Sequence, residues 1–447
     1  MECKRNTEER NNNEIKKNTV IKRNIDAKHH TVTKHSTESE YNTESENRKE
    51  FHDASTLAAD LFVSEMIFDS RMGGRRIRFL LERHVILSLR ELYTLSCIQI
   101  SQETEALLSG QEWANIRSCF KDDGKKKQAE SKAVICRDLG IQSVNRDDAS
   151  YPVNLRRLEG MPLVLYWMGD LSILGDKRMP AVAVVGSRQP TVYGVSVTKE
   201  ITKALVDHNI CIISGLARGI DTIAHEMTLA FGGRTVAVLA GGLDQVYPPE
   251  NKELFRVIKE TGLVLSEMPP GQKALRQYFP ARNRILSGLS DLVAIMEAGE
   301  FSGTLHTASF AAAQGRDVFV VPGTIYAQQS RGNLKLIQDG ADLLLSAEDI
   351  LARLAGVAFF REMDEIRQQE ERRSISRRLQ ESPELLTHSE CMQVIIEQLS
   401  LAEQTMDELI QVTGFPFGRI APLLSELELS GRVIGQRQRY ALTFYGT

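Results

Sequence analysis

Arginine residues stand beside glycines or an aromatic residue in three short segments of the central region, and these combinations suit the binding of phosphate groups. Arginine presents paired N–H donors to phosphate oxygens, and glycine lets a backbone approach a ligand closely. The residues with this chemistry are Gly186, Ser187, Arg188, Gly215, Arg218, Gly219, Phe279, Arg282, Asn283 and Arg284. The sequence therefore predicts an anion-binding site built from three separate segments.

The third of these segments adds aromatic rings to the cations. Arg282 and Arg284 flank Asn283, and Tyr278 precedes Phe279. Proteins that bind single-stranded nucleic acid combine cations for the backbone with rings on which the bases stack. The alternative interpretation places Phe279 in the core and one arginine in a structural ion pair.

The other two segments are less specific when each is taken alone. Gly186-Ser187-Arg188 lacks a GxGxxG pattern, so a dinucleotide is not indicated, and an ordinary strand-to-helix turn fits it as well. Between Ser214 and Asp221, backbone amides and Arg218 can cradle a phosphate, and Asp221 is predicted to cap the next helix. His225 has the chemistry of a base, although a structural role is favoured.

Short apolar runs rich in β-branched residues position these segments. They alternate with amphipathic stretches over residues 146–352, which predicts an α/β fold with a doubly wound, Rossmann-like parallel sheet. The runs are Val182–Val185, Ile210–Ile213, Val236–Leu239, Leu263–Leu265, Leu292–Ile295, Val318–Val321 and Leu343–Leu345. Ligands of such sheets bind at the carboxyl ends of the strands, so the arginine segments are expected to meet there.

Regions of different composition precede and follow the predicted sheet. Residues 1–55 are polar, without sustained apolar periodicity, and are predicted to form a disordered tail. Residues 56–145 show helical periodicity and are predicted to form a small helical module, with Lys125-Lys126-Lys127 as an exposed loop. The charge-dense residues 353–384 are predicted to form a linker helix.

The last region, residues 385–447, is predicted to be a winged helix. Thr405-Met406-Asp407-Glu408 has the pattern of a capping box, and a hairpin follows the third predicted helix. That helix carries Glu426 and Glu428, with Arg419 as its strong base. Such a helix suits protein contact or a folding role better than the reading of duplex DNA.

Composition limits the classes of function. The chain has 447 residues, which suits two or three domains, and a formal net charge of -4, so nucleic-acid binding requires a local basic pocket. Its six cysteines are scattered, and no metal site, cofactor site or catalytic set is expected. Without an apolar run of membrane-spanning length or a signal sequence, the protein is predicted to be cytoplasmic, with no membrane contact.

The three arginine segments, together with further motifs in the same order, resemble the DNA-processing protein A (Smf) family. The further motifs are Tyr151-Pro152, Pro162–Tyr166, Gly241–Asp244, Tyr247–Asn251, Ser266-Glu267, Pro269–Gly271, Glu297-Ala298, Ser302–Leu305, Thr307-Ala308 and Pro322-Gly323. The resemblance extends continuously over the predicted sheet region.

The resemblance implies a non-enzymatic protein whose Rossmann-like domain binds single-stranded DNA, forms homodimers and contacts the recombinase RecA. Such a protein protects incoming strands during natural transformation and helps to load RecA. The resemblance also implies that Arg188 and Arg218 line the DNA pocket, with a contribution from residues 282–284. One departure is Asn333, one position before the family's asparagine, with Leu334 in its place, which puts a polar contact of that loop in question.

An enzyme is the second hypothesis, namely a nucleotide-binding hydrolase related to phosphoribohydrolases. Glu297 with the Ser302-Gly303-Thr304 turn supports it, and Glu267 has the chemistry of an acid or base. Those enzymes carry a denser glycine motif before the threonine, so the DNA-binding hypothesis is preferred. A third hypothesis, a transcription factor acting through residues 385–447, conflicts with the acidic third helix.

Overall fold

The computed structural model describes two compact units, residues 1–347 and 348–447. The described residues are 54–68, 74, 77, 78, 81, 88–90, 93, 123–158, 160–175, 179–356, 375, 379, 386–401, 403–430, 432–436 and 439–442. The predicted disordered tail lies outside them except for its last two residues, and so does most of the predicted linker helix. No helix within the described residues is long and apolar enough to cross a membrane.

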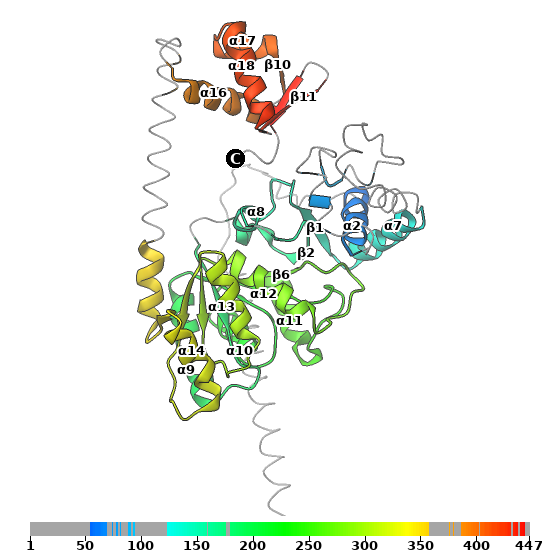
Figure 1. The fold of residues 1–447 in the computed structure, drawn as a ribbon. Coiled ribbons are helices and arrows are strands. Elements are labelled where there is room, and N and C mark those ends of the chain that lie inside the picture. The colour runs from blue at the N-terminus through cyan, green and yellow to red at the C-terminus, as the bar shows by residue number, and fades with distance from the viewer. Residues whose placement is uncertain are drawn as a thin grey trace, which may run out of the picture. The chain divides into compact units, whose positions relative to one another are not determined.

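A nine-stranded sheet forms the centre of the first unit, in the order β1-β2-β6-β5-β4-β3-β7-β8-β9 (Figure 1). The strands are β1 (Gln142–Asn145), β2 (Val164–Gly169), β3 (Ala181–Val185), β4 (Cys211–Ser214), β5 (Thr235–Leu239), β6 (Leu263–Ser266), β7 (Leu292–Ile295), β8 (Asp317–Val320) and β9 (Asp342–Leu343). From β6 to β9 all neighbours pair in parallel, which confirms the predicted parallel sheet and six of its apolar runs. The seventh run, Leu343–Leu345, overlaps the edge strand β9 only at Leu343.

Two further strands extend this sheet in the antiparallel sense. Strand β2 pairs with β6, and β1 pairs with β2 at the edge. The sequence did not indicate them as strands, because β1 is short and polar and β2 was recognised only as a family motif. The sheet therefore begins at Gln142, within the range assigned to the helical module.

Helices cover both faces of the sheet. They are α8 (Val153–Arg156), α9 (Val192–Asp207), α10 (Ile220–Ala230), α11 (Lys252–Thr261), α12 (Tyr278–Leu289), α13 (Thr304–Ala313) and α14 (Arg331–Gln338), with short 3-10 turns η1 (Leu171–Leu174), η2 (Pro249–Asn251) and η3 (Gln328–Ser330). Successive residues of β5 enter opposite cores, since Ala237 packs in one core and Val238 in the other. This two-sided burial explains the continuous apolar runs.

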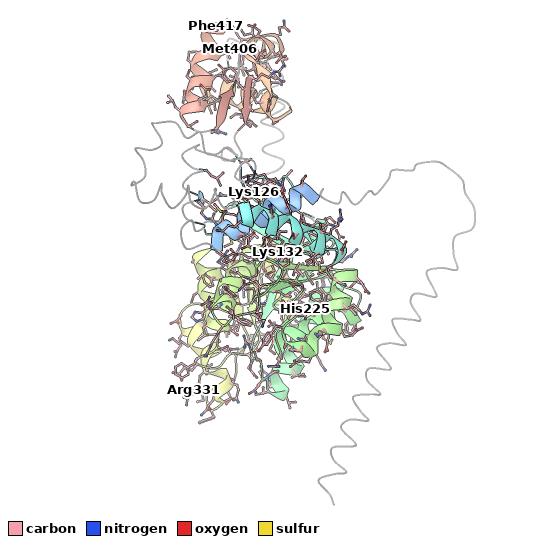
Figure 2. The ribbon with its side chains drawn as sticks, turned by 90° about the vertical axis from the view of Figure 1, so that its right-hand side faces the viewer. Lys126, Lys132, His225, Arg331, Met406 and Phe417 are labelled. Carbon is pink, nitrogen blue, oxygen red and sulfur yellow. The ribbon has the colours of Figure 1, made fainter. Side chains whose placement is uncertain are left out.

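The N-terminal helices α2 (Ala54–Phe68) and α7 (Asp123–Asp138) pack against each other and share a core with one face of the sheet. The predicted loop at Lys125-Lys126-Lys127 is wrong, because these lysines lie in α7. Lysine is a good helix former, and its stem can cover apolar surface. The Lys126 Nζ lies 5.9 Å from the Phe62 ring centroid, and Figure 2 labels Lys126 and Lys132 on this helix.

The second unit is a winged helix, as predicted. It consists of α16 (His388–Leu401), β10 (Gln404–Thr405), α17 (Met406–Thr413), α18 (Phe417–Leu429), β11 (Val433–Gln436) and β12 (Arg439–Leu442), with the strands in the order β10-β12-β11. The capping box is present, since the Thr405 hydroxyl accepts from the Glu408 amide and the Glu408 carboxylate accepts from the Thr405 amide. Strand β10 was not predicted, because two residues carry no periodic signal.

Candidate functional site

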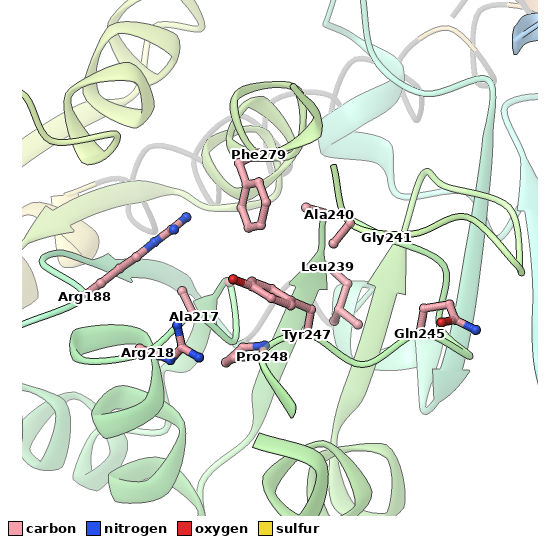
Figure 3. A pocket seen from close by; sticks show the side chains of 12 residues that line it. Arg188, Ala217, Arg218, Leu239, Ala240, Gly241, Gln245, Tyr247, Pro248 and Phe279 are labelled. Atoms are coloured by element: carbon pink, nitrogen blue, oxygen red, sulfur yellow. The ribbon is translucent and has the colours of Figure 1, made fainter. Parts of the chain in front are cut away.

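A pocket opens where β3, β4 and β5 end, between the loops that follow these strands (Figure 3). Arg188 follows β3, Arg218 follows β4, and Tyr247 lies in the loop after β5. Phe279, at the start of α12, adds a second ring to the lining. The carboxyl edge of a parallel sheet is where this class of fold holds its ligands. The structure thus joins the first two predicted segments with Phe279 of the third.

Arg188 and the two rings form a contiguous surface on the pocket. The Arg188 guanidinium carbon lies 4.9 Å from the Phe279 ring centroid, which is a cation–π distance. The Phe279 and Tyr247 ring centroids are 6.0 Å apart at an interplanar angle of 72°. Arg188 is exposed, and no carboxylate of the described residues pairs with it. The surface therefore offers a cation and π faces to a ligand.

Arg218 provides the second cation of the pocket and carries a counter-ion of its own. Its Nε donates to the Glu250 carboxylate, and both side chains are about half exposed, at 52% and 50%. The hydrogen bond with Glu250 raises the pKa of Arg218, and the same bond lowers the pKa of Glu250. Because solvent screens an ion pair of this exposure, a phosphate can compete with Glu250 for Arg218.

Two glycines let the loops after β3 and β4 lie against each other. The Ile220 amide donates to the Ser187 carbonyl oxygen at 3.1 Å. A Cβ on Gly186 would lie 2.7 Å from the Ile220 Cγ1, and Gly219 has a φ of +77°. Side chains at either position would push the loops apart or strain the backbone. These glycines therefore position Arg188 and Arg218 and need not touch the ligand.

The Asp221 carboxylate holds the loop after β4 from within. Its Oδ2 accepts hydrogen bonds from the amides of Gly215 at 3.1 Å and Ala217 at 3.3 Å. The predicted helix cap at Asp221 is therefore wrong, since the carboxylate faces the preceding loop. Two amides of the predicted phosphate cradle, those of Gly215 and Ala217, therefore already have an acceptor. Burial raises the pKa of Asp221.

Arg282 lies beneath the pocket and not in it, so its predicted role as a DNA contact is corrected. Its side chain is buried, and its Nη1 donates to the carbonyl oxygens of Gly215, at 2.6 Å, and Val238. A Cβ on Gly215 would collide with the guanidinium, which explains that glycine. Burial lowers the pKa of Arg282 to about 10. Arg282 therefore acts as a structural support for the ends of β4 and β5.

Asn283 and Arg284 are also engaged within the protein. The Asn283 Oδ1 accepts from the Arg282 Nε at 3.1 Å, and its Nδ2 donates to the Gly303 carbonyl oxygen at 3.3 Å. The Arg284 Nη2 donates to both carboxylate oxygens of Glu267, each at 2.6 Å. These residues lie in helix α12. Of the third segment, Phe279 alone lines the pocket.

His225 is a core histidine in this structure. Its side chain is fully buried, and Nδ1 lies 2.7 Å from the Thr235 hydroxyl oxygen. That hydroxyl donates to the Ile212 carbonyl oxygen at 2.8 Å, so the imidazole donates to the hydroxyl. Burial lowers the pKa of His225 to about 3, so the ring is neutral. Figure 2 labels it within the first unit.

The carboxylates that a hydrolase would need are occupied. Glu297 is buried and accepts from the Thr191 amide at 3.0 Å and from the Thr191 hydroxyl, so it anchors the start of α9. The Thr304 hydroxyl donates to the Gly186 carbonyl oxygen at 3.2 Å. Glu267 is neutralised by the bidentate contact with Arg284. These contacts give Glu297 and Glu267 structural roles.

Asn333 keeps a polar contact despite its shifted position in the sequence. Its Nδ2 donates to the carbonyl oxygens of Met296, at 3.1 Å, and Val321, at 2.7 Å. The side chain is buried and ties the ends of β7 and β8 to α14. A polar contact is therefore present in this loop, and Asn333 makes it.

Sequence reasoning overlooked the contribution of the loop after β5. Gln245, Tyr247 and Pro248 line the pocket, and Ala274 lines it from the loop before α12. The Gly241–Asp244 and Tyr247–Asn251 motifs held the available signal, although they were used only for the resemblance. Asn251 fixes this loop, since its Nδ2 donates to the Leu216 carbonyl oxygen at 2.9 Å.

In the winged helix, the predicted strong base of the third helix also serves the unit's own structure. Arg419 donates to the Leu386 carbonyl oxygen, and its guanidinium carbon lies 5.3 Å from the Phe415 ring centroid. Glu426 lies 2.7 Å from the His388 Nε2. The basic side chain of this helix is thus directed to internal contacts.

Two family models match the chain. The model described as DNA recombination-mediator protein A matches residues 142–355, and the DprA winged helix domain matches residues 380–436. Protein Smf of Synechocystis sp. is 38% identical over 308 residues, which are 65% of this chain and 77% of that protein. The DNA processing protein DprA of Bacillus subtilis is 41% identical over 218 residues, covering 49% and 73%. The X-ray structure of DNA processing protein A from Streptococcus pneumoniae is 35% identical, covers 62% of this chain and 96% of its own, and has a TM-score of 0.48.

Proposed function

Because the chain belongs to the DNA recombination-mediator protein A family, we propose that it binds single-stranded DNA in the pocket at the ends of β3, β4 and β5. The observation that carries this proposal is the exposed Arg188 guanidinium 4.9 Å from the Phe279 ring, with the Tyr247 ring beside it. Cations for phosphate and rings for bases are the two components of single-strand binding.

The single strand is favoured over duplex DNA by the kind of surface in the pocket. Rings such as Phe279 and Tyr247 can stack only on bases that are not already paired and stacked in a duplex. The net charge of the chain is -4, so no general positive field draws in duplex DNA. Arg188 and Arg218 supply the charge locally.

Fluorescence anisotropy with a labelled single strand and its duplex, across a salt series, tests this proposal. We expect tighter binding to the single strand, and Arg188→Ala and Arg218→Ala should each lower the salt slope by about 0.7 per lost phosphate contact. Arg256→Ala is the matched control, because Arg256 is 51% exposed, pairs with carboxylates and lies in α11 outside the pocket. Equal binding of both DNAs, or unchanged affinity in both pocket variants, would contradict the proposal.

We also propose that the bound strand is passed to RecA, and that the chain acts as a homodimer formed through its Rossmann-like domain. Both are implied by the resemblance to this family, and the description of the family as recombination mediators supports the first. The protein should accelerate RecA assembly on a strand coated with single-strand-binding protein, and Arg188→Ala should lose this effect. Sedimentation velocity should give the mass of two chains. If RecA assembles no faster with the protein than without it, the statement about RecA is refuted. If the protein is a monomer at all concentrations, the statement about the homodimer is refuted.

A further inference from the structure

Three neighbouring loops at the carboxyl edge of the sheet carry exposed apolar side chains. Val192 at the start of α9 is 88% exposed, Phe301 after β7 is 95% exposed, and Tyr326 after β8 is 89% exposed. Of the large apolar side chains in the described part of the chain, four are at least 88% exposed, and three of these four lie here. Tyr193 and Ile325 are also exposed. These five side chains are called here the apolar patch.

Hydrogen bonds hold the segments that carry the apolar patch together. The Tyr193 hydroxyl donates to the Pro322 carbonyl oxygen at 3.0 Å, which joins α9 to the loop after β8. The Gly332 amide donates to the Ala298 carbonyl oxygen at 3.0 Å, which joins the start of α14 to the loop after β7. A ligand that binds a surface built on such fixed segments orders little of the protein, so it loses less free energy on binding.

The apolar patch adjoins the Arg188 side of the pocket. Strand β7 pairs with β3, so the loops after these two strands leave the sheet side by side. The Thr304 hydroxyl donates to the Gly186 carbonyl oxygen at 3.2 Å, and Val192 follows Arg188 closely in the sequence. A strand that is longer than the pocket and leaves it past Arg188 therefore meets the apolar patch next.

The apolar patch combines rings with a cation, as the pocket does. The Phe301 and Tyr326 rings are almost entirely exposed, so each has a face free for a base. Arg331, labelled in Figure 2, has its Nη1 3.7 Å from a Glu300 carboxylate oxygen, and both side chains are more than half exposed. Solvent screens such a pair, so a phosphate can compete with Glu300 for Arg331. The rings thus have Arg188 on the pocket side and Arg331 close to Phe301.

We infer that the apolar patch is a second stacking surface, over which a single strand continues after it leaves the pocket past Arg188. Bases of this part of the strand stack on Phe301 and Tyr326, and Arg331 binds a phosphate beside them. Exposed apolar patches also bind proteins, but rings next to cations and continuity with the pocket favour the strand. The inference rests on the proposed function, because it extends the path of the same ligand.

A length series of labelled oligothymidylates, up to about 16 nucleotides, measured by anisotropy with the full chain, tests the inference. Wild-type affinity should rise with length beyond the shortest strand that binds. Phe301→Ala/Tyr326→Ala should bind that shortest strand normally and the long strand about 100-fold more weakly, about tenfold for each ring. The salt slope should fall by no more than about 0.7, one phosphate contact, because the substitutions remove no cation.

Abasic nucleotides separate stacking of the bases from contacts to the backbone. A long strand with an abasic stretch at one end keeps its phosphates and loses the bases there. The wild-type protein should bind such a strand, with the stretch at either the 5′ or the 3′ end, as weakly as the double variant binds the complete strand. Phe301→Trp/Tyr326→Phe keeps both rings and should retain wild-type affinity. If neither abasic strand binds more weakly, the inference is overturned.

Two variants separate failure of this inference from failure of the proposed function. Arg188→Ala should weaken strands of every length, and wild-type affinity in this variant would refute the pocket itself. Phe231→Ala removes an exposed ring at the end of α10, outside the pocket lining and the apolar patch, and should leave binding unchanged.

The second stacking surface is refuted if Arg188→Ala weakens binding while Phe301→Ala/Tyr326→Ala keeps wild-type affinity for the long strand. The apolar patch would then be a surface for a protein partner. Equal weakening of strands of all lengths by the double variant would also overturn the inference, because the patch would then act on the pocket itself.

Discussion

Replacing the buried Arg282 by methionine should destabilise the protein, whereas replacing the exposed Arg188 should affect DNA binding alone. Arg282→Met keeps the length of the side chain and removes its charge and donors. It leaves the Gly215 and Val238 carbonyl oxygens without their donor and removes the positive charge that faces the buried Asp221. The loop that carries Arg218 then loses its support.

The expected loss is large because two buried carbonyl oxygens would lose a charged donor. A buried polar group left unsatisfied costs about 1–3 kcal/mol, so two of them cost about 2–6 kcal/mol, a sizeable share of the 5–15 kcal/mol that typically stabilises a protein. Arg188→Met removes an exposed cation–π contact and should change the free energy of unfolding by about 1 kcal/mol or less. The two arginines, both predicted from sequence as DNA contacts, are thus expected to behave oppositely.

Urea unfolding, followed by fluorescence of the tryptophans, which include Trp167 of β2, measures this difference. Arg282→Met should lower the midpoint by about 2 M, and Arg188→Met should leave it nearly unchanged. In parallel measurements, Arg188→Met should have a lower DNA affinity than the wild-type protein while its stability is unchanged. If Arg282→Met unfolds at the wild-type midpoint and yet loses DNA affinity, then Arg282 contacts DNA and its structural role is refuted.

Three further predictions concern other residues of the site and its support. Glu250→Gln removes the carboxylate that competes for Arg218, so single-strand affinity should rise about two- to fivefold at low salt; unchanged affinity would show that the ion pair does not limit binding. His225 has its pKa lowered to about 3, so the unfolded chain takes up a proton that the folded chain does not as pH falls below 6.5. Wild-type stability should therefore fall by about 1.4 kcal/mol per pH unit toward pH 3, and His225→Gln should show a flatter urea-midpoint profile; parallel profiles would refute this. Gly219→Ala should lower both the stability and the DNA affinity, because the added methyl group meets the neighbouring loop. Gly232 also has a positive φ, of +72°, but has open space around it. Gly232→Ala should therefore show only the backbone cost of about 1–2 kcal/mol in thermal melts and should bind DNA normally.

The inner strands of the parallel sheet were predictable because they are buried on both faces. Burial on both sides demands continuous apolar, β-branched runs, and six such runs coincide with strands. The seventh run overlaps the exposed edge strand β9 only at Leu343. The edge strand β1 reads Gln-Ser-Val-Asn and carries no such signal. Its place depends on pairing with β2 and on the packing of α2, which are contacts distant in the sequence.

The site was predictable in its location and only partly in its residues. Glycines and arginines after strands indicated the carboxyl edge correctly, because the topology of the fold brings those loops together. The residue type alone could not distinguish the exposed Arg188 from Arg282, because both are arginines and only the fold buries the Arg282 side chain under Gly215. That difference arises from the turn of α12, which directs Phe279 to the pocket and places Arg282 beneath it.

Polar groups near the pocket were assigned ligand roles because the sequence does not show which of them already have partners within the protein. The amides of Gly215 and Ala217 looked free for a phosphate, yet Asp221, close in sequence, folds back to accept from them. Glu297 supported the hydrolase hypothesis, yet it holds Thr191 at the start of α9. Whether a polar group binds a ligand or makes internal hydrogen bonds depends on distances in the folded protein, which cannot be read from the sequence.

Ultraviolet crosslinking of a single strand containing 5-bromodeoxyuridine, with the adducts mapped by mass spectrometry, tests the central claim most directly. It reports where the bases lie and does not depend on any substitution. We predict adducts on the peptides that contain Tyr247 and Phe279, and their loss when unlabelled single strand competes. Adducts confined to residues 386–442, with none at the pocket rings, would contradict the account.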